Sequence, residues 1–383
     1  GLIDPFLRSD GSRVASADDW SAQREHLKEM LTFYLYGDVP DRPEEVDIEL
    51  EAEEEVFGGK AIRKLLTLSA ERNGHRADLR VGLIVPAEEG PFPVIIKNDG
   101  YRFDAKDVAD PGKRKRMVEE ERADVEESVF EDAVGRGYAI CKFIRTDWAD
   151  DTPDSRDRGI YPLYPDCEWG AITIWAWTFS VLIDWLEDDA SIDTDKVIVT
   201  GHSRGGKTAL AAGILDECIC VTAPNSSGGG GTGSLRIFKP GLRQQRVANQ
   251  RRNSHWWHPR FFEFVEREEH LPFDAHTLKS LIAPRHLFNA HALQDDWANP
   301  YGTQITYEAA QCVYETLGVP ERQGIHWRGG GHAQSEIDWQ ALLDFCDVHV
   351  RGVGRSRSFD ALPFHYTDKH RALLTQYQSL FKE

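Results

Sequence analysis

The sequence predicts an α/β protein with one doubly wound, mostly parallel sheet that is flanked by helices on both faces. From residue 138 onward, short apolar runs typical of buried strands alternate with longer helical segments. The 383 residues also show no repeat, low-complexity tract or linker that would divide them. We therefore expect a single three-layer sandwich over residues 1–383. Residues 1–55 are expected to form a helical extension packed on it.

The first predicted elements are a helix and three strands. Residues 18–40, "DDWSAQREHLKEMLTFYLYGDVP", have apolar side chains at helical spacing and predict a helix that ends near Gly37. Strands are expected at 60–69, at 77–85 and in "PFPVIIKNDGYRFD", an apolar run that leads into a loop. The charge-rich residues 106–127 predict a solvated helix or excursion, to which we assign no function.

The later elements alternate regularly between strand and helix. The expected strands are "YAICKFI" (138–144), "KVIVT" (196–200), "CICVTAPNSS" (218–227), "HLFNAHA" (286–292) and "IHWRG" (325–329). The expected helices are "WGAITIWAWTFSVLIDWLED" (169–188), "SRGGKTALAAGILD" (203–216) and a final amphipathic one, "SEIDWQALLDFCDVHV" (335–350). This alternation is typical of a doubly wound sheet.

The composition restricts partners and location. A formal net charge of −19 argues against binding to nucleic acid, which attracts basic surfaces. No apolar run approaches the roughly 20 residues of a membrane span.

The six scattered cysteines do not suggest a disulfide framework, so we expect free buried thiols. We expect a monomer without cofactor or metal. It would be secreted or periplasmic if a leader was removed, and otherwise cytoplasmic.

Residues 196–213, "KVIVTGHSRGGKTALAAG", match two unrelated active-site patterns. The run from Gly201 to Thr208 is G-x-x-x-x-G-K-T, a phosphate-binding loop, whereas the residues around Ser203 are G-x-S-x-G, a nucleophile elbow. A phosphate loop needs an acidic residue at the tip of another strand, where it can hold Mg²⁺. The best candidate, Asp184, lies inside the long apolar helix. We therefore favour the elbow over a nucleotide-binding site.

The elbow requires a histidine and a carboxylate further along the chain. A serine hydroxyl becomes a strong nucleophile only when a histidine accepts its proton, and a carboxylate must orient that histidine. In such hydrolases the three residues follow the order serine, acid, histidine, each after a strand. Asp295 and Asp296 follow the expected strand 286–292, and His332 lies in a glycine-rich loop after the last strand. The residues alone leave both aspartates open as the acid.

The oxyanion that forms during attack needs preorganised hydrogen-bond donors. One donor is expected to be the backbone N–H of Arg204, which follows the nucleophile at the start of a helix. The second is expected from Gly100 or Tyr101, in the loop after "PVIIKNDGYR", and we assign it to Tyr101.

Several longer stretches together resemble the bacterial glucuronoyl esterases, carbohydrate esterase family 15. They are "WGAITIWAWTFSVLIDWLEDDASIDTDKV", "VTGHSRGGKTALAAG", "LPFDAHTLKSLIAPRHL", "DDWANPYG" and "GGGHAQSEIDWQALLDF". The similarity extends from about Trp20 to the last expected helix. It implies an α/β-hydrolase fold and hydrolysis of glucuronic acid esters in plant cell-wall polymers.

The resemblance also implies roles for single residues. It implies Ser203 as nucleophile and His332 as base. Arg204 would assist the oxyanion with its side chain as well as its backbone. Lys207 would donate hydrogen bonds to sugar hydroxyls, and Trp297 would line the sugar pocket. No cofactor is implied, and the implied partner is a carbohydrate ester.

The sequence departs from the family pattern at two places. Members commonly carry the acid as a glutamate before a Ser-Gly-x-Gly-Gly segment, where this chain has Ser226 in "PNSSGGGG". Some bacterial members instead use an aspartate two residues before the pocket tryptophan, which implies Asp295 rather than Asp296. A glutamate that contacts the uronic acid is missing from "GSLRIFKPGLRQQ".

We therefore expect a serine esterase that cleaves the carboxyl ester of a uronic acid of the 4-O-methyl-glucuronoyl type. Pectin methylesterase-like or acetyl xylan esterase activity on the same fold is an alternative. A carbohydrate-binding homologue without activity is another. His255 and His258 in "NSHWWHPRFF" have a spacing that suits a metal, but no third ligand accompanies them. We expect this aromatic stretch to form a sugar-facing wall or part of the core.

Overall fold

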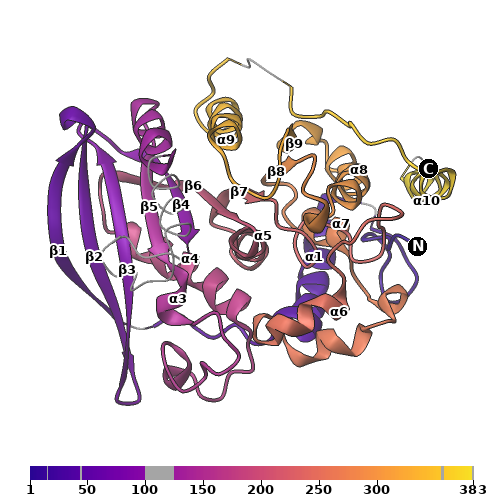
Figure 1. Cartoon of the computed structure of the whole chain (residues 1–383), viewed down its shortest axis with the longest axis horizontal. Helices are drawn as coiled ribbons and strands as arrows, with labels where there is room; N and C mark the ends of the chain where they lie inside the picture. The colour runs from indigo at the N-terminus through magenta and orange to yellow at the C-terminus, as the bar shows by residue number, and fades with distance from the viewer. Residues whose placement is uncertain (15, 44, 100–124, 355–357, 382–383) are drawn as a thin grey trace.

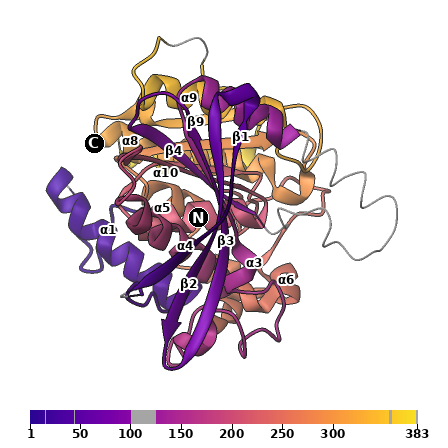
Figure 2. The same cartoon turned by 90° about the vertical axis from the view of Figure 1, so that its left-hand side faces the viewer.

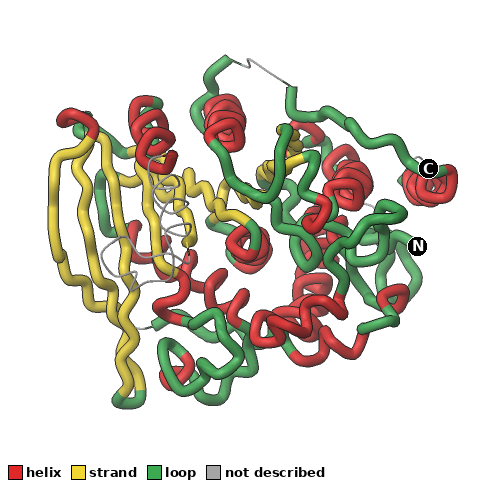
Figure 3. Tube along the Cα trace, viewed as in Figure 1, coloured by secondary structure: helices red, strands yellow, loops and turns green. Residues whose placement is uncertain are grey.

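The structure is a computed structural model that describes residues 1–14, 16–43, 45–99, 125–354 and 358–381. Within these residues one twisted sheet runs through the molecule in the strand order β1-β2-β3-β5-β4-β6-β7-β8-β9 (Figures 1 and 3). The strands are β1 (Val46–Val56), β2 (Ala61–Arg72), β3 (His75–Pro86), β4 (Phe92–Asp99), β5 (Ala139–Ile144), β6 (Ile192–His202), β7 (Ile219–Asn225), β8 (His286–Ala292) and β9 (Gln323–Arg328).

The sheet is antiparallel at one end and parallel over the remainder. The pairs β1–β2, β2–β3 and β3–β5 are antiparallel, whereas every pair from β5 through β4 to β9 is parallel. Parallel neighbours need long crossovers, and helices supply them. The carboxyl ends of β6, β8 and β9 consequently lie at the same edge of the sheet.

Helices cover both faces of the sheet (Figure 2). On one face α4 and α5 pack on the strands, and α1 and α7 belong to the same apolar core, whereas the core on the other face contains α9 and a helix over residues 125–135. The described helices are α1 (Ala17–Leu31), α3 (Arg145–Trp148), α4 (Ala171–Leu186), α5 (Arg204–Leu215), α6 (Val247–Gln250), α7 (Ala275–Ser280), α8 (Pro300–Thr316), α9 (Glu336–His349) and α10 (Asp368–Ser379).

Strand β4 shows how the apolar runs fill both layers. Val94 and Ile96 belong to the core under α4 and α5, whereas Ile95 belongs to the core under α9. Successive side chains of a strand point to opposite faces, so a strand buried on both sides is apolar throughout. The expected α/β-hydrolase fold class and the expected strands and helices from residue 138 to 350 are present in the structure.

The N-terminal extension is less helical than predicted. Residues 46–56 form β1, which pairs with β2 at the edge of the sheet, so only the part before them can be a helical extension. Apolar residues do stand at every second position of β1, from Val46 through Ile48 and Leu50 to Ala52. The prediction missed the strand because acidic residues occupy the positions between, and nearly all of β1 is exposed.

The predicted final helix is not the last one. Helix α10 follows α9 and packs against α8 through Leu374 and Tyr377. Most of its other residues are polar, so its sequence has only a weak apolar stripe.

Two further expectations concern cysteines and membranes. All six cysteines are free, as expected. Only Cys141, Cys312 and Cys346 are buried, whereas Cys167 and Cys220 are partly buried and Cys218 is exposed. No helix in the described part of the chain has the length and apolar character needed to cross a membrane.

Candidate active site

The nucleophile elbow lies between β6 and α5. Ser203 has φ 58° and ψ −118°, a conformation that non-glycine residues rarely adopt and that a functional site retains. The glycines of the motif are needed for close approach, because a Cβ on Gly205 would lie 2.7 Å from Asn98 Oδ1. Asn98 on β4 donates hydrogen bonds to the backbone oxygens of Thr200 (3.2 Å) and Gly205 (3.0 Å). The Asn98 side chain therefore stabilises the turn at Ser203 by hydrogen bonds to the backbone on both sides of it.

A hydrogen-bonded chain joins the three residues that the sequence predicts as a catalytic triad. His332 Nε2 lies 2.8 Å from Ser203 Oγ, and His332 Nδ1 lies 2.7 Å from Asp295 Oδ2. Asp295 is buried with 4% of its surface exposed, whereas Asp296 is exposed at the start of the short helix η8 (Asp296–Ala298). Of the two aspartates, the structure thus places Asp295 beside the histidine.

The pKa of Asp295 lies below the usual value. Burial, the largest single cause, would raise it, but the lowering contributions together outweigh burial, and the hydrogen bond and charge of His332 are the largest of them. His291 and the Ala298 N–H lower the pKa further. Asp295 therefore stays ionised at neutral pH and can orient the imidazole.

A buried arginine holds the loop that carries His332. Arg328, at the end of β9, donates hydrogen bonds to three backbone oxygens of the loop 329–333. Its Nε also donates to Asp338 Oδ2 at 2.6 Å, where both side chains are almost fully buried. The glycine-rich loop has few side chains to pack, so hydrogen bonds fix its course, chiefly those of Arg328 and in addition two between Gly330 and Gln294.

Arg204 lies at the first position of α5 and extends into the pocket. Its guanidinium pairs with Asp151 and lies over the Trp256 ring, 5.0 Å from the centroid. Asp151 also accepts hydrogen bonds from His255 Nε2 (2.9 Å) and Trp256 Nε1 (2.7 Å). Burial would raise the pKa of Asp151, but these hydrogen bonds and the charge of Arg204 hold it well below its usual value.

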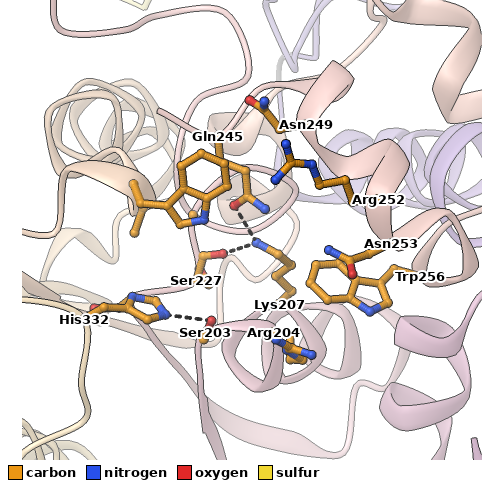
Figure 4. A pocket seen from close by; sticks show the side chains of 14 residues that line it. Ser203, Arg204, Lys207, Ser227, Gln245, Asn249, Arg252, Asn253, Trp256 and His332 are labelled. Atoms are coloured by element: carbon orange, nitrogen blue, oxygen red, sulfur yellow. Dashed lines mark hydrogen bonds between the residues drawn. The ribbon is translucent and has the colours of Figure 1, made fainter. Parts of the chain in front are cut away.

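Lys207 is buried beneath the pocket (Figure 4). Its Nζ donates to the backbone oxygens of Ser227 and Gly229 and to Gln245 Oε1 at 3.1 Å. Burial and the charge of Arg204 lower its pKa to about 7. Three protein oxygens already match the three hydrogens of the ammonium group. The implied contact with a sugar hydroxyl would require that hydroxyl to replace one of them.

The pocket around these residues has a volume of about 310 Å³, enough for a small ligand. Trp297 lies on its wall with 39% of its surface exposed, so its ring is accessible to a sugar. Ser226 also faces the pocket and cannot replace a carboxylate. Gly100, Tyr101 and most of the charge-rich segment 106–127 lie outside the described residues.

The other residues considered from the sequence, Asp184, His255 and His258, do not line the pocket. Asp184 lies inside α4, as expected, and pairs with Arg42. His255 contacts Asp151, whereas His258 contacts the N–H of Arg260. In the parts of the chain that the structure describes, no cluster of three potential metal ligands occurs.

Sequence reasoning missed several residues that line the pocket. Gln245 ends the segment in which a glutamate was sought, and Asn249, Arg252 and Asn253 follow it on α6 and the helical stretch η5 (Arg251–Trp256). Their spacing of i, i+3 and i+4 was visible in "NQRRNSHW". Without the fold, however, nothing indicated that this helix face points at Ser203.

The chain is similar to several known proteins. A family model described as "Glucuronyl esterase, fungi" matches residues 122–318. The carbohydrate esterase MZ0003 from an unknown prokaryotic organism is 30% identical over 92% of this chain and 90% of its own length. A 4-O-methyl-glucuronoyl methylesterase from Schizophyllum commune is 30% identical over 90% of this chain and 79% of its own. The solved structure of a family 15 glucuronoyl esterase from Caldicellulosiruptor kristjansonii aligns with a TM-score of 0.79 and 32% identity. That alignment covers 96% of this chain and 95% of the other.

Proposed function

The chain belongs to carbohydrate esterase family 15, the glucuronoyl esterases, and we propose that it hydrolyses carboxyl esters of 4-O-methyl-glucuronic acid and closely related uronic acids. It is a carboxylic-ester hydrolase, as its relatives are. The observation that carries the proposal is the hydrogen-bonded chain from Ser203 through His332 to Asp295, inside a polar pocket.

In the first half of the reaction, Ser203 Oγ attacks the ester carbon while His332 Nε2 accepts its proton. In this mechanism the backbone N–H of Arg204, at the positive end of α5, and the Arg204 side chain donate hydrogen bonds to the developing oxyanion. The C–O bond to the alcohol then breaks, and the alcohol leaves with the proton from His332. An acyl-enzyme on Ser203 remains.

In the second half, His332 removes a proton from water, and the hydroxide attacks the acyl-enzyme. The uronic acid leaves, and Ser203 regains its proton. Asp295 stays ionised throughout and stabilises the imidazolium in both halves. Every step uses groups of this chain and water, so the mechanism requires no metal or cofactor.

The decisive experiment replaces the nucleophile. Ser203→Ala should lower kcat for methyl 4-O-methyl-glucuronate by at least about 10⁴-fold, because the acyl-enzyme cannot form. Ser254→Ala, at an exposed position outside the pocket lining, is the control and should keep wild-type activity. A fluorophosphonate should label wild-type protein but not Ser203→Ala. Turnover by Ser203→Ala at the wild-type rate would contradict the mechanism.

Two further expectations stay predictions. A monomer would be recognised by light scattering during size-exclusion chromatography. A secreted or periplasmic location, in the presence of a leader, would be recognised by fractionation of the producing cells.

A further inference from the structure

One face of a helical segment forms a wall of the active-site pocket. Asn249, Arg252, Asn253 and Trp256, on α6 and η5, are spaced i, i+3, i+4 and i+7, and all four line the pocket. Figure 4 shows the Arg252 side chain extending from this segment toward Gln245 and Lys207. A charged side chain thus projects over the site where the ester would bind.

The charges of this pocket are unbalanced. Among the lining residues that the structure describes, Arg204, Lys207 and Arg252 are basic and none is acidic. Asp151 neutralises Arg204, but Lys207 contacts only uncharged oxygens. Arg252 forms no ion pair with any described residue. The whole chain has a net charge of −19, so this local excess of positive charge opposes the overall trend.

The wall also offers neutral donors beside the guanidinium. Asn249 Oδ1 accepts a hydrogen bond from the Arg246 N–H at 3.0 Å. This contact fixes the carboxamide, and Nδ2 has no hydrogen-bond partner among the described residues, so it can donate to a ligand in the pocket that Asn249 lines. A guanidinium accompanied by amide N–H groups is a set of donors suited to a carboxylate.

Arg204 serves the oxyanion that forms during the reaction and the esterified carboxyl itself carries no charge, so the reacting group does not explain Arg252. We propose that Arg252, with Asn249, forms a subsite for a second, free carboxylate on the sugar next to the esterified one. The enzyme would then prefer partly esterified polyuronates, in which free and esterified uronic acids are neighbours. This inference rests on the proposed esterase function and specifies its substrate class.

The test compares two esters of one disaccharide. Wild-type kcat/KM should be about tenfold higher for digalacturonate with one methyl ester and one free carboxylate than for its dimethyl ester, as expected for one charge-assisted hydrogen bond. Arg252→Gln should abolish this preference, so that the ratio of the two kcat/KM values falls to about one. The preference of the wild type should also fall as NaCl rises from 20 to 500 mM.

Arg251→Gln is the matched control, because Arg251 is the exposed neighbour outside the pocket lining and should keep the preference. Equal kcat/KM for the two esters, or no hydrolysis of either, would overturn the subsite. An Arg252→Gln variant that loses activity equally on both esters would also overturn it. Hydrolysis of methyl glucuronate in parallel separates these outcomes from failure of the esterase function itself.

Discussion

The conformation of a single residue, Ser203, places its hydroxyl at the tip of a sharp turn. Its positive φ is strained for a side chain with a Cβ, and the contacts of Asn98 beneath the turn maintain it. Residues with a side chain do not fit at positions 201 and 205, because a Cβ at either Gly201 or Gly205 would collide with Asn98. The G-x-S-x-G spacing is thus a packing requirement as well as a signature.

The position of Asp295 and Asp296 in the structure gives a prediction about single residues. Asp295→Asn should lower kcat by about 10⁴-fold, because an amide cannot stabilise the imidazolium or select its tautomer. Asp296→Asn should leave kcat within about twofold, since exposed substitutions away from the site have small effects. Steady-state kinetics on methyl glucuronate would measure both. The reverse ranking would show that Asp296 is the acid.

The lowered pKa of Lys207 gives a prediction about pH. Its pKa of about 7 means that the ammonium loses its proton as the pH rises from 6 to 8. Neutral Lys207 has two hydrogens for three oxygens, so Gln245 and the loop after Ser227 are held less firmly. KM should therefore rise about fivefold between pH 6 and 8, as expected for weakening one charged hydrogen bond.

The variant Lys207→Gln provides the comparison for this pH effect. Its KM should be high at both pH values and should not change between them. A wild-type KM that is constant from pH 6 to 8 would show that the charge of Lys207 does not organise the pocket.

At the scale of elements, the site depends on loops after the strands, and buried side chains fix the conformation of these loops by hydrogen bonds. The strands β6, β8 and β9 deliver Ser203, Asp295 and His332 to one edge of the sheet. The loop after β9 is nevertheless held chiefly by Arg328, which spans three backbone oxygens and Asp338. Arg328 thus acts as a positioning residue for the histidine.

Arg328→Lys should show whether Arg328 positions His332 for catalysis or only stabilises the fold. An ammonium cannot reproduce the planar set of donors, so the loop should lose contacts while the charge next to Asp338 remains. We expect kcat to fall about 10- to 100-fold, with little change in KM, because His332 is misplaced. Thermal unfolding measured in parallel should show a loss of only a few degrees.

Arg328→Met should do more damage, because it leaves Asp338 buried without its partner, which costs about 3–5 kcal/mol. An Arg328→Lys variant with wild-type kcat would show that the loop 329–333 keeps its conformation without the hydrogen bonds of the Arg328 guanidinium.

Charge is the property that matters at the scale of the whole molecule. A net charge of −19 repels itself, and β1 concentrates acidic side chains on an exposed edge. Such charges discourage pairing of the edge strand with other chains. They also destabilise the compact state where no cation compensates them.

The melting temperature should therefore rise when salt screens this repulsion. We expect an increase of a few degrees from 10 to 300 mM NaCl, since the Debye length falls from about 30 Å to below 8 Å. The triple variant Glu49→Gln, Glu51→Gln and Glu53→Gln removes three exposed charges of β1 and should show a smaller increase. A melting temperature that falls with salt would mean that attractive ion pairs dominate instead.

The sequence by itself determined the chemistry and most of the layering. Alternation of apolar runs predicts strands and helices because periodicity is a local property. It identified the strands β5 to β9 and the helices α4, α5 and α9 between residues 138 and 350. The motif around Ser203, with the order of acid and histidine after it, predicted a serine hydrolase, and the resemblance to family 15 implied an esterase. It did not reveal β1, where acidic residues conceal the alternation, or the largely polar α10.

Only the tertiary structure decided which residues surround the substrate. Arg328 beneath the His332 loop and Asp151 behind Arg204 depend on contacts between segments far apart in the chain. The wall formed by Asn249, Arg252 and Asn253 depends on how one helical segment is oriented over the edge of the sheet. Periodicity tells which side chains share a face, but only packing determines what that face meets.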